Sequence, residues 1–266
     1  MRITRFAAGD EVSYGLVGTA GAGSPAAGGE VIAELAGHPL GAGKDGIRLT
    51  GTTYLLDEVR LLAPVLPSKV IGFVPSGAEL TGRSHDGLGG GSVMYLKPST
   101  AVCGPSDAIQ SPSLTHRLEA EGKLAVVIGR LCRHVLPEQA AAAIFGYACA
   151  LDVTAADLRE QDGQWARAKG FDTFCPLGPW IETDAAHGGP ELVMSVNGQE
   201  RQRARMPGAG AEVAALVAAA SSVMTLLPGD VLLAGAAGAV ALEYADGVSV
   251  SIDGIGTLTN RVEKGD

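Results

Sequence analysis

Clusters of lysine and arginine are absent from this sequence. Its 20 basic residues are scattered along the chain and outnumbered by 29 acidic ones, which gives a formal net charge of −9. A protein that holds nucleic acid by its phosphates needs a basic surface. We therefore expect no nucleic-acid partner.

Long hydrophobic segments are also missing. The most apolar window, Val213 to Leu227, is shorter than the ~20 residues that a membrane span requires, and it contains Ser221 and Ser222. The N-terminus carries Arg5 and Asp10 where a signal peptide would have an apolar core. We expect a cytoplasmic protein with no membrane partner.

Close cysteine pairs of the kind that bind zinc do not occur. The four cysteines are Cys103, Cys132, Cys149 and Cys175. Their wide spacing predicts free thiols in a reducing compartment. The glycine-rich segment 21–29 lacks the Gly-Lys-Ser/Thr ending of a phosphate-binding loop, so a nucleotide site of that type is not expected.

What the sequence does contain is a globular composition with many turns. Of its 266 residues, 46% are hydrophobic, 18% are charged and 38 are glycine, which suits one principal domain with a substantial core. Short apolar runs bounded by turn residues predict strands at 70–74, 92–96, 124–128, 192–196, 231–233 and 248–252. Helices are predicted at Pro137–Tyr147 and Ala211–Leu226.

Glycine-rich breaks near the N-terminus indicate a separate lobe. Short apolar runs alternate with these breaks up to Pro64 and Pro67. We predict a small N-terminal β-rich lobe over residues 1–62 and a main, catalytic domain over residues 63–266. Strands outnumber helices in both parts, so the expected fold class is α+β, mainly β.

The segment from Gln164 to Pro179 reads QWARAKGFDTFCPLGP and is the most specific motif in the chain. It resembles, almost residue for residue, the signature of the fumarylacetoacetate hydrolase (FAH) family. Further matches flank it in the expected order: Tyr95–Pro98, Leu124–Gly129, Asp152–Ala155, Val196–Gly198 with Gln202, Leu227–Asp230 and Ile252–Gly256. The resemblance implies an FAH-like β-roll catalytic domain and a homodimer.

Enzymes of the FAH family cleave, decarboxylate or tautomerise acylpyruvates and related 2-oxo acids. The resemblance implies a divalent metal, typically magnesium, on two Glu and one Asp, where hard carboxylate oxygens hold a cation that stabilises an enolate. Asp152 matches the Asp ligand, and Lys169 matches a lysine that polarises a substrate oxygen. Gln164 would orient the substrate, and Lys97 would contact it or form a structural ion pair.

The Glu pair departs from the family pattern. Family members carry Glu-x-Glu before Leu-Ala-Val-Val-Ile-Gly, and anchoring on Leu124 puts Glu121 at the first ligand position and Lys123 at the second. In an alignment shifted by two residues, Glu119 and Glu121 form the pair, because such residues share a face of a strand. We expect the unshifted alignment, with the ammonium of Lys123 beside Glu121 and Asp152 in place of a metal. The alternative is that Lys123 bends away to solvent.

The lid motif has changed as well. Where the family has a catalytic His after the first strand of the core, this chain reads Val74–Ala78. Glu79 and His85 are candidates for a displaced base, because the glycine-rich segment 82–91 has the composition of a loop that could close over a pocket. The alternative for His85 is a solvent-exposed loop residue.

Two further motifs of the expected pocket are altered. The segment Thr154–Asp157 lacks an Arg common in the family, and the loop 234–238 has lost two Thr hydroxyls. Gly235 and Ala236 would then bind a substrate through backbone donors, and an anionic group would be held less well.

Our first hypothesis is a divergent FAH-family enzyme that acts on a small carbonyl or enol substrate by acid–base chemistry. The reaction would be isomerisation, cyclisation, dehydration or carbon–carbon cleavage, without a tightly held metal, as in secondary metabolism. Lys123 and Lys169 would polarise the substrate oxygen, and Glu121 or Asp152 would accept a proton.

Two alternatives stay open. One is a conventional magnesium-dependent acylpyruvate hydrolase or 2-oxo acid decarboxylase, with Glu119, Glu121 and Asp152 as metal ligands. The other is a non-catalytic, dimeric binding or scaffold protein that has kept the fold.

Overall fold

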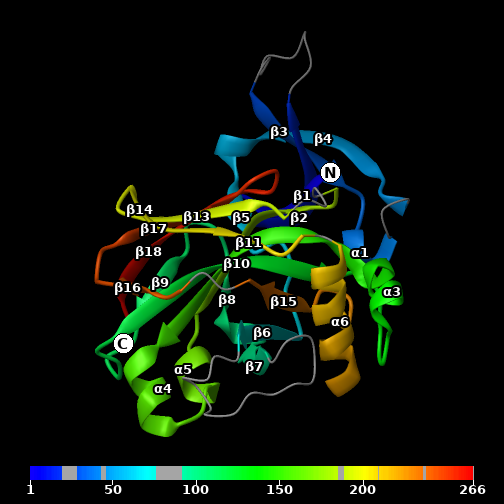
Figure 1. Ribbon diagram of the computed structural model, residues 1–266. Coiled ribbons are helices and arrows are strands. Elements are labelled where there is room, and N and C mark those ends of the chain that lie inside the picture. The colour runs from blue at the N-terminus through cyan, green and yellow to red at the C-terminus, as the bar shows by residue number, and fades with distance from the viewer. Residues whose placement is uncertain are drawn as a thin grey trace.

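The computed structural model describes residues 1–19, 29–42, 46–75, 92–184, 189–208, 210–235 and 238–265 of the chain. These residues form an α+β fold that is mainly β, with two sheets and a few short helices (Figure 1). The fold class expected from the sequence is confirmed.

The larger sheet contains thirteen of the described strands. Ten follow the order β4-β3-β2-β1-β12-β11-β10-β15-β6-β7, and β16 pairs with β10, β5 with β1 and β8 with β12. The strands are β1 Arg2–Ala8, β2 Glu11–Thr19, β3 Glu30–Leu35, β4 Leu49–Leu55, β5 Arg60–Leu62, β6 Lys69–Pro75, β7 Ser92–Pro98, β8 Val102–Cys103, β10 Leu118–Ile128, β11 Ile144–Ala155, β12 Cys175–Glu182, β15 Val231–Ala234 and β16 Val240–Leu242.

The smaller sheet has the order β14-β13-β17-β18-β9. Its strands are β9 Ala108–Ser111, β13 Glu191–Val196, β14 Gln199–Arg205, β17 Gly247–Ile252 and β18 Gly256–Lys264. The α-helices are α1 Pro39–Ala42, α3 Pro137–Ala140, α4 Ala156–Asp162, α5 Ala166–Lys169 and α6 Ala211–Val223, and the 3₁₀ helices are η2 Leu56–Glu58, η3 Ser99–Ala101 and η4 Ala141–Ala143. No helix in the described part of the chain is long and apolar enough to cross a membrane.

The antiparallel pair β10–β11 forms the centre of the molecule. One face of the pair, which includes Leu124 and Leu151, belongs to the same buried core as Met194 and Val250 of the smaller sheet. Because alternate residues of a strand point to opposite faces, the intervening residues face away from this core. That second face carries the charged residues described below.

The six predicted strands are all present, within β6, β7, β10, β13, β15 and β17. The helix predicted over Pro137–Tyr147 is wrong in its second half: the helical turns end at Ala143, and Ile144 already pairs with Ile128 of β10. Phe145 and Tyr147 are buried in the sheet, and that burial outweighs helical periodicity. The second predicted helix is present but ends at Val223, before Leu226.

The N-terminal strands are continuous with the larger sheet. β1 pairs with β12 at Arg2↔Glu182 and Ile3↔Ile181. The division into a lobe over 1–62 and a catalytic domain over 63–266 stays a prediction.

Candidate functional site

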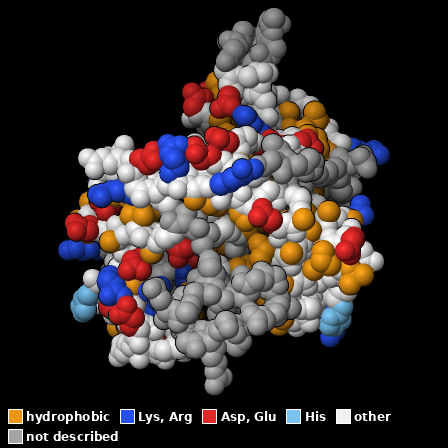
Figure 2. All heavy atoms as spheres, in the orientation of Figure 1, with side chains coloured by type: hydrophobic (Ala, Val, Ile, Leu, Met, Phe, Trp, Pro, Cys, Tyr) orange, Lys and Arg blue, Asp and Glu red, His pale blue; other side chains and the backbone are white. Residues whose placement is uncertain are grey.

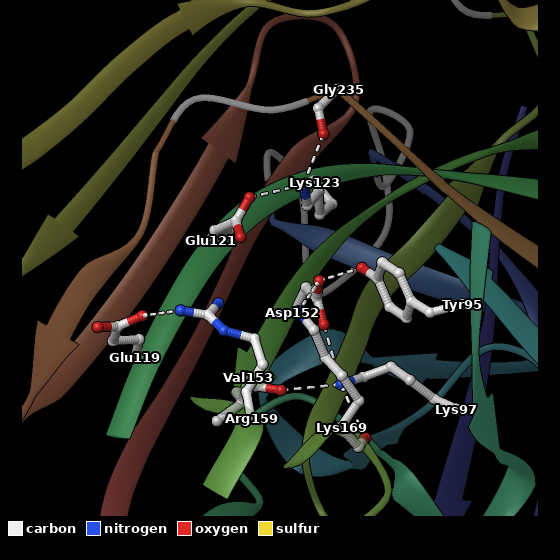
Figure 3. A network of polar contacts seen from close by, with 10 residues as sticks. All are labelled: Tyr95, Lys97, Glu119, Glu121, Lys123, Asp152, Val153, Arg159, Lys169 and Gly235. Carbon is white, nitrogen blue, oxygen red and sulfur yellow. Dashed lines mark hydrogen bonds and ion pairs between the residues drawn. The ribbon is translucent and has the colours of Figure 1, made fainter. Parts of the chain in front are cut away.

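Alternation along β10 places Glu119, Glu121 and Lys123 on one face of the sheet. Asp152 lies directly opposite Glu121 on β11, where paired side chains of antiparallel strands come within contact distance. Figure 3 shows the four charged groups with Lys97 of β7 and Lys169 of α5 beside Asp152. The sheet register therefore explains how residues from distant segments meet.

Asp152 is fully buried and surrounded by donors. The Nζ of Lys169 lies 2.6 Å from its Oδ2, and the Nζ of Lys97 lies 2.9 Å from its Oδ1. The hydroxyl of Tyr95 also donates a hydrogen bond to Oδ2. Burial by itself raises the pKa of Asp152, but the surrounding ammonium groups, that of Lys169 first, hold the pKa below its ordinary value. Asp152 is therefore a fixed anion and a weak base.

The contacts of Lys97 are those of a structural residue. Its side chain is completely buried, and its Nζ donates hydrogen bonds to the backbone oxygens of Val153, at 2.8 Å, and Lys169, at 3.0 Å. Its approach to Asp152 Oδ1 is an ion pair outside hydrogen-bond geometry, so this oxygen receives no hydrogen bond. These contacts favour the structural ion pair over direct substrate binding by Lys97.

Lys123 points into the cluster. Its Nζ lies 2.7 Å from Oε2 of Glu121 and donates a hydrogen bond of 2.7 Å to the backbone oxygen of Gly235. The Lys123 side chain is 1% exposed and that of Glu121 is 14% exposed. Glu121 is therefore the more accessible of the two central carboxylates, and the alternative in which Lys123 bends to solvent does not match this geometry.

Gly235 has a backbone conformation and a neighbourhood that require glycine. Its φ is +86°, and a Cβ would lie 2.6 Å from the sulfur of Met206. The chain can thus turn sharply here and present the carbonyl of residue 235 to Lys123. Ala236, Glu79 and His85 lie outside the described residues.

Glu119 is turned away from the other carboxylates. It forms ion pairs with the Nε of Arg117, at 3.4 Å, and with a guanidinium nitrogen of Arg159, at 3.8 Å. The structure thus brings Glu121 and Asp152 together, whereas Glu119 lies beside Arg159 and apart from them (Figure 3).

Aromatic rings cover Lys169. Its Nζ lies 4.6 Å from the ring centroid of Tyr95 and 5.4 Å from that of Trp165, and these two rings stack at 5.2 Å. Burial lowers the pKa of Lys169 to about 8, while the charge of Asp152 opposes that shift. A lysine with this pKa can donate and regain a proton near neutral pH.

Gln164, predicted to orient the substrate, is exposed, and its Oε1 accepts a hydrogen bond of 2.6 Å from the amide of Ala166 at the start of α5. The structure does not bring this side chain to the lysines. Reasoning from sequence missed Tyr95 and Trp165 as neighbours of Lys169. One signal for Tyr95 is Gly72 inside β6, since strand glycines often mark a close approach.

A divalent cation does not fit the donors around Asp152. Among the described residues, no group of three or more His, Cys, Asp or Glu side chains is arranged to hold a metal ion. Of the three predicted ligands only Glu121 and Asp152 are neighbours, and the ammonium of Lys123 occupies one oxygen of Glu121. Three buried ammonium groups would also repel a cation at this place.

Comparison with known proteins agrees with this architecture. Residues 85–263 match the family model described as fumarylacetoacetate (FAA) hydrolase C-terminal, and residues 1–64 match the one described as Rv2993c-like, N-terminal. Protein Rv2993c of Mycobacterium tuberculosis is 44% identical over 271 residues, an alignment that covers 98% of each chain.

Solved structures give the same picture. A protein from Mycobacterium smegmatis named 5-carboxymethyl-2-hydroxymuconate delta-isomerase is similar with a TM-score of 0.85 and 42% identity over 100% of both chains. A maleylpyruvate hydrolase from Sphingobium sp. SYK-6, solved with manganese(II) and pyruvate, is similar with a TM-score of 0.73 and 27% identity over 100% of both chains.

Proposed function

Because this chain belongs to the fumarylacetoacetate hydrolase family, we propose that it is an enzyme that moves a proton on a small 2-oxo or enol acid without a divalent metal. Hydrolases and isomerases are named among its relatives. The observation that carries the proposal is the ammonium of Lys123, buried and 2.7 Å from Glu121.

The charges of the cluster suit an anionic substrate. Among the residues that the structure describes, Lys97, Lys123 and Lys169 form ion pairs with two carboxylates, those of Glu121 and Asp152, so these five groups together carry one excess positive charge. Fixed ammonium groups in a site of low water content stabilise negative charge that develops on an oxygen during a reaction. Lys123 and Lys169 would therefore hold the oxygen of an enolate.

Glu121 is the better candidate for the base. Its carboxylate is partly exposed and has one close ammonium partner, whereas Asp152 is inaccessible and its pKa is lowered. Glu121 would remove the hydroxyl proton of an enol, or a proton from the carbon next to the carbonyl of a 2-oxo acid, and the electron pair of the broken bond would remain in the enolate. Return of a proton to another carbon of the conjugated system then completes an isomerisation.

A spectroscopic assay tests this proposal. The protein, treated with a chelator, is mixed with 5-carboxymethyl-2-hydroxymuconate, the compound in the name of the M. smegmatis relative, and loss of its enol absorbance is followed. We expect a rate that magnesium does not raise, and a loss of about 100-fold or more in Glu121→Gln, because general-base catalysis contributes that much. The exposed Glu138 supplies a control: Glu138→Gln should keep the rate.

A second function is a conventional metal-dependent hydrolase. The manganese in the maleylpyruvate hydrolase structure favours it, as does the neighbouring pair Glu121 and Asp152. Activity that appears only with magnesium or manganese, together with pyruvate release from an acylpyruvate, would establish this alternative and overturn the metal-free proposal.

A further inference from the structure

The hydroxyl of Tyr95 occupies one lone-pair position of the carboxylate of Asp152. It donates to Oδ2, the same oxygen that the ammonium of Lys169 contacts at 2.6 Å. A carboxylate oxygen has about two lone-pair positions, so these two donors saturate Oδ2. In the view of Figure 3 this oxygen lies on the side of Glu121 and Lys123.

The second carboxylate oxygen is blocked in a different way. Oδ1 of Asp152 has no solvent access and lies 2.9 Å from the ammonium of Lys97. A cation placed against Oδ1 would therefore stand beside a buried positive charge. On the other strand, Lys123 occupies Oε2 of Glu121. Each of the two neighbouring carboxylates thus has one oxygen that accepts a hydrogen bond from a side chain of this chain.

The place of the Tyr95 ring is built into the sheet. Tyr95 pairs with Gly72 of β6, and a Cβ on Gly72 would lie 1.9 Å from the Cζ of the ring. The ring of Trp165 stacks on that of Tyr95 with an interplanar angle of 22°. Burial, followed by the charge of Asp152, raises the pKa of Tyr95 well above its ordinary value, so the group stays a phenol and keeps its donor.

We propose that Tyr95 is a positioning residue that, together with Lys123, excludes divalent cations from the Glu121–Asp152 pair. It fixes Asp152 as a counterion for the lysines and leaves Glu121 as the group that reacts. The inference rests on the proposed function for the role of the cluster, but its test measures metal binding and needs no substrate. Restoring a metal site then requires two substitutions, which remove the Tyr95 donor from Asp152 and the Lys123 donor from Glu121.

Manganese(II) binding, measured by calorimetry and by electron paramagnetic resonance, tests this inference on wild type, Lys123→Glu, Tyr95→Phe and the double variant Lys123→Glu/Tyr95→Phe. We expect at least tenfold tighter binding by the double variant than by either single variant. A control double variant, Lys123→Glu/Tyr147→Phe, changes another buried tyrosine and should bind like Lys123→Glu alone. Tyr95→Phe keeps the ring, and circular dichroism verifies the fold of each variant.

The other outcomes decide whether Tyr95, Lys123 or neither excludes the metal, and whether the proposed function fails separately. If Lys123→Glu alone binds manganese as tightly as the double variant, Tyr95 has no part in excluding the metal. If the folded double variant also fails to bind, the two donors are not what keeps a cation out. Tight binding by the wild type overturns both the exclusion and the metal-free function, whereas weak wild-type binding with gain in the double variant supports the exclusion even if no isomerase activity is found.

Discussion

Asp152 and Asp230 are both fully buried carboxylates paired with lysine, yet they are held by different kinds of donors. Asp230 accepts hydrogen bonds from the amides of Ser68, Lys69 and Leu227, at 3.1, 3.2 and 2.8 Å, and from the Ser68 hydroxyl at 2.6 Å. The ammonium of Lys69 completes the set. These donors belong to the chain around β6 and β15, so Asp230 ties two parallel strands together.

The donors that contact Asp152 in the described chain are side chains, those of Tyr95, Lys97 and Lys169. Backbone amides can only hold a carboxylate in place, whereas ammonium and phenol groups can also exchange protons and meet a ligand. The comparison teaches that burial and a lysine partner do not by themselves mark a reactive carboxylate; the type of donor does.

The largest expected effect separates the two lysine partners. Lys97→Met should lower the free energy of unfolding by about 3–5 kcal/mol, since it removes one of the two buried ammonium partners of Asp152 and leaves the backbone oxygens of Val153 and Lys169 without this donor. Lys69→Met should cost about 1 kcal/mol, because Asp230 keeps its other donors and Lys69 is partly exposed. Urea denaturation of both variants measures the difference. Equal losses would mean that the two carboxylates are held alike.

A smaller loss is expected from Gly72→Ala, which probes the packing of Tyr95 against β6. The new methyl group would overlap the phenol ring, so we expect a loss of about 1–3 kcal/mol or displacement of the ring. Gly18→Ala is the matched control in β2, where a Cβ meets nothing within 4 Å. Thermal unfolding distinguishes the two, and a neutral Gly72→Ala would show that the ring is free to move.

Each of the two carboxylates has one hydroxyl donor, and removing that donor sharpens the comparison further. Tyr95→Phe and Ser68→Ala each delete one hydrogen bond to an ionised group, which should cost about 1.5–3 kcal/mol in either case. Only Tyr95→Phe should change the rate of substrate turnover and, when combined with Lys123→Glu, the affinity for a metal. If Ser68→Ala alters them equally, the distinction between a structural and a reactive carboxylate fails.

The smallest effect is a pH dependence from Lys169. If its protonated form acts in the reaction, kcat should fall about tenfold per pH unit above about 8, because the folded-state pKa is about 8. In Lys169→Arg, which stays protonated, the residual rate should lose that fall. The ordinary pKa of lysine, 10.5, is higher than that of Lys169 in the folded protein. Between about pH 8 and pH 10.5 the unfolded chain therefore binds more protons at this residue than the folded chain does. The contribution of Lys169 to the free energy of unfolding rises with pH over this range. A fall in kcat above about pH 8 that persists in Lys169→Arg would assign the pH dependence to another group.

The fold was predictable where strands carried clear apolar runs between turn residues. The run at 124–128 predicted β10, but the strand begins at Leu118. Its first half alternates charged with small residues and shows no apolar pattern, since its second face lines the cluster. The helix predicted up to Tyr147 ends too early for a related reason: Ile144 pairs with Ile128 of β10, and this distant contact is not visible in the local sequence.

The candidate site was predictable only in part. The sequence motif around Lys169 and the register of Leu124 indicated that Glu121, Lys123, Asp152 and Lys169 would meet, and they do. The role of Tyr95 was not predictable from its own segment, because its partner Asp152 lies 57 positions away on another strand. Contacts of this kind depend on how sheets are assembled, which local sequence does not specify.

The pairing of Glu121 with Asp152 on β10 and β11 has a consequence for how the protein loses its structure. Both strands lie in the best-buried part of the sheet, and amides in such strands exchange with solvent mainly when the whole domain opens. The peptide hydrogens at these positions should therefore be among the slowest to exchange with deuterium. A site placed there would be destroyed together with the domain and not before it.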